Sequence, residues 1–317
     1  MRTLLAIAVL AAVSATAADS PREVITLPIT SPIRFFNFAR NSSTVTALCR
    51  DHQVRVWTLP DGKLLRTFDV GDQPFEMVII SDDGRLLFTG DHSGAVNIWD
   101  TSSGKAEWQE RLPHYPGVAT FSRDSGLLAF AAQGDPVQVI DLPTKRKLYQ
   151  LEPTPGGATA LAFSRDGSML AVAEADTTVR VYEVHSGKLL SRNQDFVMEP
   201  LAIDFSADGR YVLAAGADKI LVFIDPASGR IVRRLEKTTE PAAYIEVSPS
   251  GDAIAAVFIK AANLSEPAPM TIWDIASGQR RAEWLPTSRP MGGAWTRDGH
   301  VQFVTVTQEA AHIWLTP

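Results

Sequence analysis

The chain has 317 residues, of which 45% are hydrophobic and 8% aromatic, as expected for a folded globular protein. Its 36 acidic residues outnumber the 30 lysines and arginines, and the formal net charge is −6. This balance, without a cluster of basic residues, argues against nucleic acid or an anionic membrane as the main partner. A single cysteine, Cys49, excludes an intramolecular disulfide.

The first twenty residues differ in composition from the rest. Arg2 precedes an apolar run, Leu4–Val13, and small residues follow. This order is typical of a secretory signal peptide, and the run is too short to span a bilayer. We predict residues 1–17 as a cleaved signal peptide and 18–317 as one mature domain, periplasmic or secreted. We expect neither a lipid anchor nor a transmembrane anchor.

A five-residue pattern recurs along the remaining chain. Its clearest copy reads Phe163-Ser164-Arg165-Asp166-Gly167. The other copies begin at Phe38, Ile80, Phe121, Phe205, Val247 and Trp295, at steps of 42, 41, 42, 42, 42 and 48 residues. Asp-Gly between apolar runs marks a hairpin turn. Seven copies at this period indicate a repeat fold with one four-stranded unit per repeat.

A second repeated pattern follows each copy. β-branched or other apolar residues stand at alternate positions and lead to an aromatic or apolar residue, as in Val96-Asn97-Ile98-Trp99-Asp100. Most repeats then continue into a Ser-Gly turn. The third repeat has Lys145 in place of that glycine. Alternation predicts strands with one buried face, so each unit reads strand a, Asp-Gly turn, strand b, loop, strand c, Ser-Gly turn, strand d. Prolines near the start of strand a, where no ladder hydrogen bond is lost, mark most unit boundaries: Pro32, Pro74, Pro116, Pro200, Pro241 and Pro290.

Together the two patterns resemble the WD-repeat β-propeller family over about residues 22–317. The resemblance implies an all-β fold, a seven-bladed β-propeller of four-stranded antiparallel blades. The family's Gly-His pair before strand a is missing, and only His114 lies near that place, which implies a divergent, bacterial-type propeller. The seventh unit ends at 314–316 without a strand d, whereas Val24–Pro28 is unassigned. We predict that this N-terminal strand pairs in the last blade and closes the ring.

The d–a and b–c loops of such blades share one side of the disc, here called the d–a/b–c face. Variable loops on a rigid scaffold favour this face for binding over the side with the tight turns. The long irregular segment 260–269 also belongs to it, as a binding loop or as a neutral excursion. Aromatic, Met and Arg side chains are enriched in interface cores, so we predict partner-binding residues among its charged, aromatic and Met side chains. They are Arg34, Phe75, Glu76, His114, Tyr115, Phe196, Met198 and Arg289.

The chemical motifs of enzymes are weak in this chain. No phosphate loop or nucleophile elbow occurs, and no two of the six histidines have the close spacing of a typical zinc site. We assign no catalytic residue, no metal ligand and no cofactor. The sequence favours an exported, non-enzymatic, monomeric scaffold that binds a protein or peptide partner in the cell envelope.

A propeller enzyme, lactonase-like or quinoprotein-like, is the alternative. Its metal or cofactor would lie at the central opening, near Asp72, Glu76, His114 and Glu199. The segment 100–108 is similar to the tryptophan-docking pattern of quinoprotein propellers, although the spacing is met only once. Fold alone does not decide between a scaffold and an enzyme.

Overall fold

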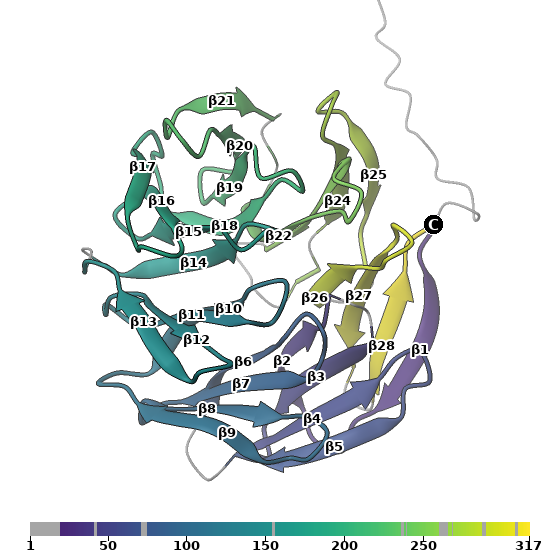
Figure 1. The fold of residues 1–317 in the computed structure, drawn as a ribbon. Helices are drawn as coiled ribbons and strands as arrows, with labels where there is room; N and C mark the ends of the chain where they lie inside the picture. The colour runs from purple at the N-terminus through teal and green to yellow at the C-terminus, as the bar shows by residue number, and fades with distance from the viewer. Residues whose placement is uncertain are drawn as a thin grey trace, which may run out of the picture.

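A computed structural model describes residues 20–40, 43–70, 75–153, 156–235, 238, 240–259, 266–267, 269–286, 290–307 and 310–317, without the side chains of Phe75, Glu76 and Gly292. In this part the chain forms strands β1 to β28, arranged in seven four-stranded antiparallel sheets. The sheets follow one another around a ring as the blades of a propeller (Figure 1). The predicted fold is confirmed. The predicted signal peptide, residues 1–17, lies outside the described residues.

Each blade runs from an inner strand a to an outer strand d. Blade 1 comprises β2 (Ile33–Phe38), β3 (Thr44–Cys49), β4 (Gln53–Thr58) and β5 (Leu64–Asp69), and blade 2 comprises β6 (Phe75–Ile80), β7 (Leu86–Asp91), β8 (Ala95–Asp100) and β9 (Ala106–Arg111). Blade 3 comprises β10 (Pro116–Phe121), β11 (Leu127–Ala132), β12 (Gln138–Asp141) and β13 (Arg146–Gln150), and blade 4 comprises β14 (Ala158–Phe163), β15 (Met169–Glu174), β16 (Val179–Glu183) and β17 (Leu189–Asn193).

The second half of the ring repeats this order. Blade 5 comprises β18 (Pro200–Phe205), β19 (Val212–Gly216), β20 (Leu221–Ile224) and β21 (Ile231–Arg234), and blade 6 comprises β22 (Ala242–Val247), β23 (Ala253–Phe258), β24 (Met270–Asp274) and β25 (Arg280–Trp284). Blade 7 comprises β26 (Pro290–Trp295), β27 (Val301–Val306), β28 (Ala310–Leu315) and, as its outer strand, β1 (Arg22–Pro28). Each inner strand contacts the inner strands of the two blades beside it, so the ring is continuous at its centre. The described residues include no helix long and apolar enough to cross a membrane.

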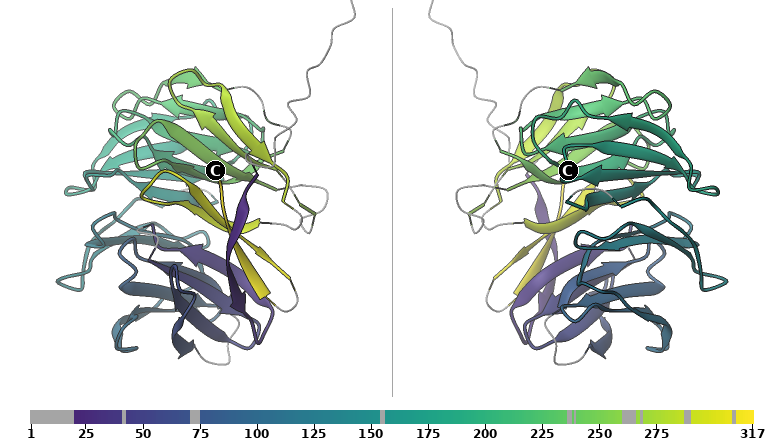
Figure 2. Two further views of the ribbon diagram at one scale, coloured as in Figure 1. Left: turned by 90° about the vertical axis from the view of Figure 1, so that its right-hand side faces the viewer. Right: turned by 90° about the vertical axis from the view of Figure 1, so that its left-hand side faces the viewer.

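The ring is closed by the N-terminal strand, as predicted. β1 pairs antiparallel with β28, with Leu27 opposite Ala311, and Figure 2 shows purple β1 beside the yellow strands of blade 7. Leu27 is fully buried in the core between blades 7 and 1. Glu23 lies across the seam from His312, with Oε1 2.8 Å from Nδ1. The first and last strands therefore share one sheet, and β28 is not left as an unpaired edge strand.

The repeated Ser-x-Asp-Gly turns are hydrogen-bonded units. In blade 4 the Ser164 hydroxyl donates to Asp166 Oδ1 at 2.6 Å and accepts the Met169 N–H at 2.9 Å. The same Asp oxygen accepts the Ser168 N–H at 3.0 Å, and Gly167 has φ of +70°. Blades 2, 3 and 5 repeat the Ser-to-Asp bond at 2.6 to 2.7 Å. Each residue type in the motif therefore has a local structural role, since Ser and Asp satisfy backbone donors and Gly adopts the left-handed conformation.

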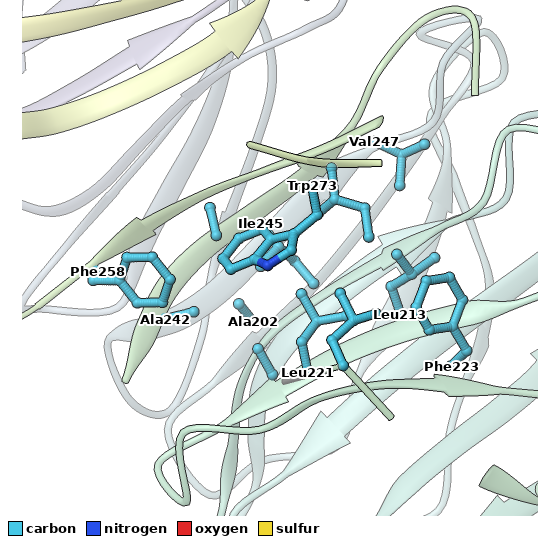
Figure 3. Close-up of a cluster of buried hydrophobic side chains, with 13 residues drawn as sticks. Ala202, Leu213, Leu221, Phe223, Ala242, Ile245, Val247, Phe258 and Trp273 are labelled. Atoms are coloured by element: carbon cyan, nitrogen blue, oxygen red, sulfur yellow. The ribbon is translucent and has the colours of Figure 1, made fainter. Parts of the chain in front are cut away.

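Each hydrophobic core lies between two neighbouring blades. The cluster in Figure 3 joins Leu213 and Phe223 of blade 5 to Ile245, Phe258 and Trp273 of blade 6. The Trp273 ring meets the Phe258 ring edge-on, with centroids 5.9 Å apart. Alternate residues of each strand thus face the neighbouring blade, which explains why the sequence repeats the period-2 pattern in every unit.

Candidate functional site at the d–a/b–c face and the central channel

The predicted binding residues come from several loops of the d–a/b–c face. Arg34 is exposed on β2, His114 is exposed in the loop before β10, and Met198 is exposed before β18. Phe75 and Glu76 begin β6, but their side chains fall outside the described part. The remaining predictions on undescribed residues are Arg289, Asp72 and most of segment 260–269.

One predicted contact residue, Phe196, is not on the surface. Its side chain is only 7% exposed and belongs to a core cluster with Ile203 and Val222. The loop between β17 and β18 turns this ring inward because it fills the space between blades 4 and 5. The prediction of Phe196 as a surface contact is therefore corrected: it is a core residue that anchors its loop.

Blades 2 and 3 bring five polar and aromatic side chains together, which we call the histidine–tyrosine cluster: His92, His114, Tyr115, Gln133 and Asp135. The rings of His92 and Tyr115 meet edge-on with centroids 5.1 Å apart. The Tyr115 hydroxyl donates to Gln133 Oε1, and His114 Nδ1 lies 3.2 Å from Asp135 Oδ2. Sequence reasoning identified His114 and Tyr115 but not the way in which loops from two blades combine around them.

The loops that carry this cluster are also joined through their backbones. The Leu112 N–H donates to the Gly94 carbonyl at 2.8 Å, and the Gln133 N–H donates to the Tyr115 carbonyl at 3.1 Å. The b–c loop of blade 2 is therefore bonded to the d–a loop that follows it, which is in turn bonded to the b–c loop of blade 3. A surface held in this way is preorganised, which lowers the entropic cost of binding.

The inner strands enclose a central cavity of about 410 Å³. Its lining is mixed, with Phe35, Met77, Val118 and Leu201 as apolar members and Tyr244 as an aromatic polar one. Beside this cavity, sequence reasoning missed a recurring structural position. Three polar residues stand second from the end of strand a, where other blades have apolar residues or threonine: Asn37, Asp204 and Glu246.

Each of these three side chains accepts a backbone N–H from the next blade. Asn37 Oδ1 accepts from Ile80 at 3.2 Å, Asp204 Oδ2 accepts from Val247 at 3.0 Å, and Glu246 Oε2 accepts from Trp295 at 3.1 Å. They therefore fasten the inner strands of neighbouring blades to one another. The signal in the sequence was a polar residue at the second-last position of a largely apolar strand a.

Charged side chains gather at the Asp-Gly-turn end of the cavity, in what we call the channel-end ion cluster: Asp204 and Glu246 are buried, and Arg40, Asp82 and Arg123 are partly buried. Arg40 Nε lies 3.3 Å from Glu246 Oε1 and 3.9 Å from Asp82 Oδ1. Arg123 Nη1 lies 3.7 Å from Asp82 Oδ2. These ion pairs link blades 6, 1, 2 and 3 by charge.

Burial has opposite consequences for the two kinds of charge. It raises the pKa of the Glu246 carboxyl, although Arg40 opposes that shift, and it raises the pKa of Asp82 in the same way. Burial alone would lower the pKa of Arg40, but the neighbouring carboxylates hold it well above its usual value. Arg40 therefore stays charged, and removing either partner would leave an uncompensated buried charge. Among the described residues no group of three or more His, Cys, Asp or Glu side chains is arranged to hold a metal ion.

Two family models match parts of the chain. The model described as "WD domain, G-beta repeat" matches residues 62–100, and the "Anaphase-promoting complex subunit 4 WD40 domain" model matches residues 119–196. A curated relative, the "WD repeat-containing protein SL1-17" of Schistosoma mansoni, is 28% identical over 95 residues, which are 30% of this chain. The aligned stretch spans 32% of that relative.

The architecture of the protein is that of a closed seven-bladed β-propeller with four-stranded blades. The two matched stretches, residues 62–100 and 119–196, are similar to WD40 repeats. Propellers built of WD40 repeats typically serve as protein-interaction scaffolds.

Proposed function

We propose that this protein is an exported, non-enzymatic scaffold that binds a protein or peptide partner of the cell envelope through its d–a/b–c face. The histidine–tyrosine cluster is the observation that carries the proposal. It offers an aromatic ring, two imidazoles and an amide on loops that are bonded to one another. Tyrosine is enriched at protein interfaces because it combines a large apolar ring with a hydrogen-bonding end.

A matched pair of variants tests this use of the face. The double variant Tyr115→Ala, His114→Ala removes two members of the cluster, whereas Arg210→Ala changes an exposed arginine beside a turn of the opposite face. Both are compared with the unmodified mature protein in affinity capture from envelope extract. Loss of a stoichiometric protein partner in the double variant alone supports the proposal. Unchanged capture in all three contradicts it, as does a bound cofactor in place of any protein.

The export part of the proposal rests on the sequence of residues 1–17. N-terminal sequencing of the protein recovered from its own cells tests it directly. A chain that begins at Ala18 in the envelope fraction supports export. A chain that keeps Arg2 and the apolar run in the cytoplasmic fraction contradicts it.

A further inference from the structure

The loop between β17 and β18 exposes two consecutive apolar side chains. Val197 is 84% exposed and Met198 is 49% exposed, whereas Phe196 beside them is buried. We call this pair the Val197–Met198 tip. Exposed apolar residues are common one at a time, but two neighbours that protrude from a loop of the proposed binding face need a further explanation.

The tip is held firmly at both ends. On one side the buried Asn193 amide donates to Asp195 Oδ2 at 3.1 Å and to the Gly229 carbonyl at 2.9 Å. On the other side the Glu199 carbonyl accepts the Ala217 N–H at 3.1 Å. Together with the buried Phe196 ring, these contacts fix the loop, so the exposure of its two apolar side chains is built into the structure.

Carboxylates surround the tip. Asp195 and Glu199 flank it in sequence and are exposed, and Asp218 lies in the b–c turn whose neighbour Ala217 is bonded to Glu199. Within the described part of the chain, none of these three carboxylates has a lysine, arginine or histidine nitrogen at ion-pair distance.

The basic side chains of this corner are directed to other acids. Arg192 Nη2 lies 4.0 Å from Asp176 Oδ2, and Lys219 Nζ lies 3.8 Å from Glu240 Oε2. The surface around the tip therefore combines an apolar protrusion with three carboxylates that pair with no cation among the described residues. Its sign complements a cation and opposes an acidic partner.

We infer that this corner of blades 4 and 5 binds a cationic segment of the partner protein in which lysine or arginine alternates with apolar side chains. The inference rests on the proposed function of the d–a/b–c face and names the chemistry of its partner. The apolar side chains of that segment cover Val197 and Met198, and its cations pair with Asp195, Glu199 and Asp218. A protruding tip offers no enclosed volume for a small molecule, so a polypeptide that lies across it is the occupant that buries it. Methionine adapts its shape to such contacts.

The test uses the mature protein and three labelled synthetic peptides of one length. The first alternates lysine with leucine, the second replaces each lysine by glutamate, and the third replaces each leucine by serine. Binding is measured by fluorescence anisotropy at low and at high salt. Tight binding of the first peptide alone, weakened by salt, is the expected result. Equal binding of the lysine and glutamate peptides, or no binding of the first, overturns the inference.

Variants locate the binding to the tip. We expect the double variant Val197→Ser, Met198→Ser and the double variant Glu199→Gln, Asp218→Asn each to raise the Kd of the first peptide on the order of tenfold. Val232→Ser is the matched control, because Val232 is 54% exposed on the outer strand β21. Equal loss in this control would show non-specific adhesion and overturn the inference.

Partner capture separates this inference from the proposed function. Capture that depends on Tyr115 and His114 but not on the tip leaves the proposed function standing and refutes the cationic corner. Capture that depends on neither refutes both.

Discussion

The Trp273 indole provides a sharp test of how the blades of this propeller are stabilised. In blades 2 and 7 the corresponding tryptophan donates to a threonine of strand b that lies two residues beyond the tryptophan's own register partner. Trp99 Nε1 donates to Thr89 Oγ1 at 2.9 Å, and Trp314 Nε1 donates to Thr305 Oγ1 at 2.8 Å. In blade 6 the register places Ala256 at the threonine position. Figure 3 shows the Trp273 indole, with its nitrogen in blue, among the side chains of this core. Trp273 Nε1 is buried and has no hydrogen-bond acceptor among the described residues.

Replacing Ala256 by threonine should supply the missing acceptor. Ala256 and Trp273 both line a small cavity of about 10 Å³ beside Phe258, so part of the added volume has space. A typical intramolecular hydrogen bond contributes about 1 kcal/mol, and relief of a buried unsatisfied donor adds about 1–3 kcal/mol. Overpacking subtracts about 1–3 kcal/mol. Because these terms oppose each other, the absolute change is less informative than a comparison with an isosteric side chain.

Ala256→Val is that isosteric control, since valine has the shape of threonine without its hydroxyl. We expect Ala256→Thr to be more stable than Ala256→Val by about 1 kcal/mol in urea unfolding. In the reverse direction, Thr89→Val in blade 2 should lower the free energy of unfolding by about 1–2 kcal/mol, because it leaves the Trp99 N–H without its acceptor. If Ala256→Thr were less stable than Ala256→Val, its hydroxyl would be buried without a partner, and the reasoning would be refuted.

Two further predictions concern ring closure and acid stability. Leu27→Ala should destabilise the propeller by about 2–5 kcal/mol in urea unfolding, because Leu27 is fully buried in the seam between β1 and the first blade; an unchanged midpoint would contradict closure by β1. Hydrogen bonds from Ser102 and Ser103 lower the pKa of Asp100 from 3.8 to about 2, so the unfolded state binds more protons between these values and stability falls as the pH drops through this window. Asp100→Asn and Ser102→Ala should both make the free energy of unfolding less dependent on pH between pH 4 and pH 2. If both variants lost stability with the same slope as the unmodified protein, the assignment to Asp100 would be refuted.

The fold was predictable because its signals are local and repeated. Ser164, Asp166 and Gly167 each have a turn function that depends only on residues within a few positions, so seven copies of the motif were sufficient to count the blades. Ring closure followed from counting strands, and the pairing of β1 with β28 confirms it. Lys145, which replaces the glycine of the other Ser-Gly turns, adopts the same left-handed backbone conformation, with φ of +57°.

The site was less predictable because its geometry joins residues that are distant in sequence. Phe196 and Met198 are two positions apart on one loop, yet one fills a core and the other is exposed. No local pattern separates them, since an irregular loop has no fixed period of burial. His114 was predictable as a loop residue, but its proximity to Asp135 depends on the pairing of the start of β10 with the end of β11.

The same limit applies to Glu246, which strengthens ring closure at the centre of the disc. One of its carboxylate oxygens accepts the Trp295 N–H of blade 7, and the other lies 3.3 Å from Arg40 Nε of blade 1. Arg40 therefore reaches blade 6 past the inner strand of blade 7, whose sequence includes Gly293. The N-terminal strand β1 closes the outer edge of blade 7, and Glu246 joins blade 6 both to the inner strand of blade 7 and to Arg40 of blade 1. Because the partly exposed guanidinium of Arg40 compensates the buried carboxylate of Glu246, the ring is closed at the centre by charge and at the rim by strand pairing.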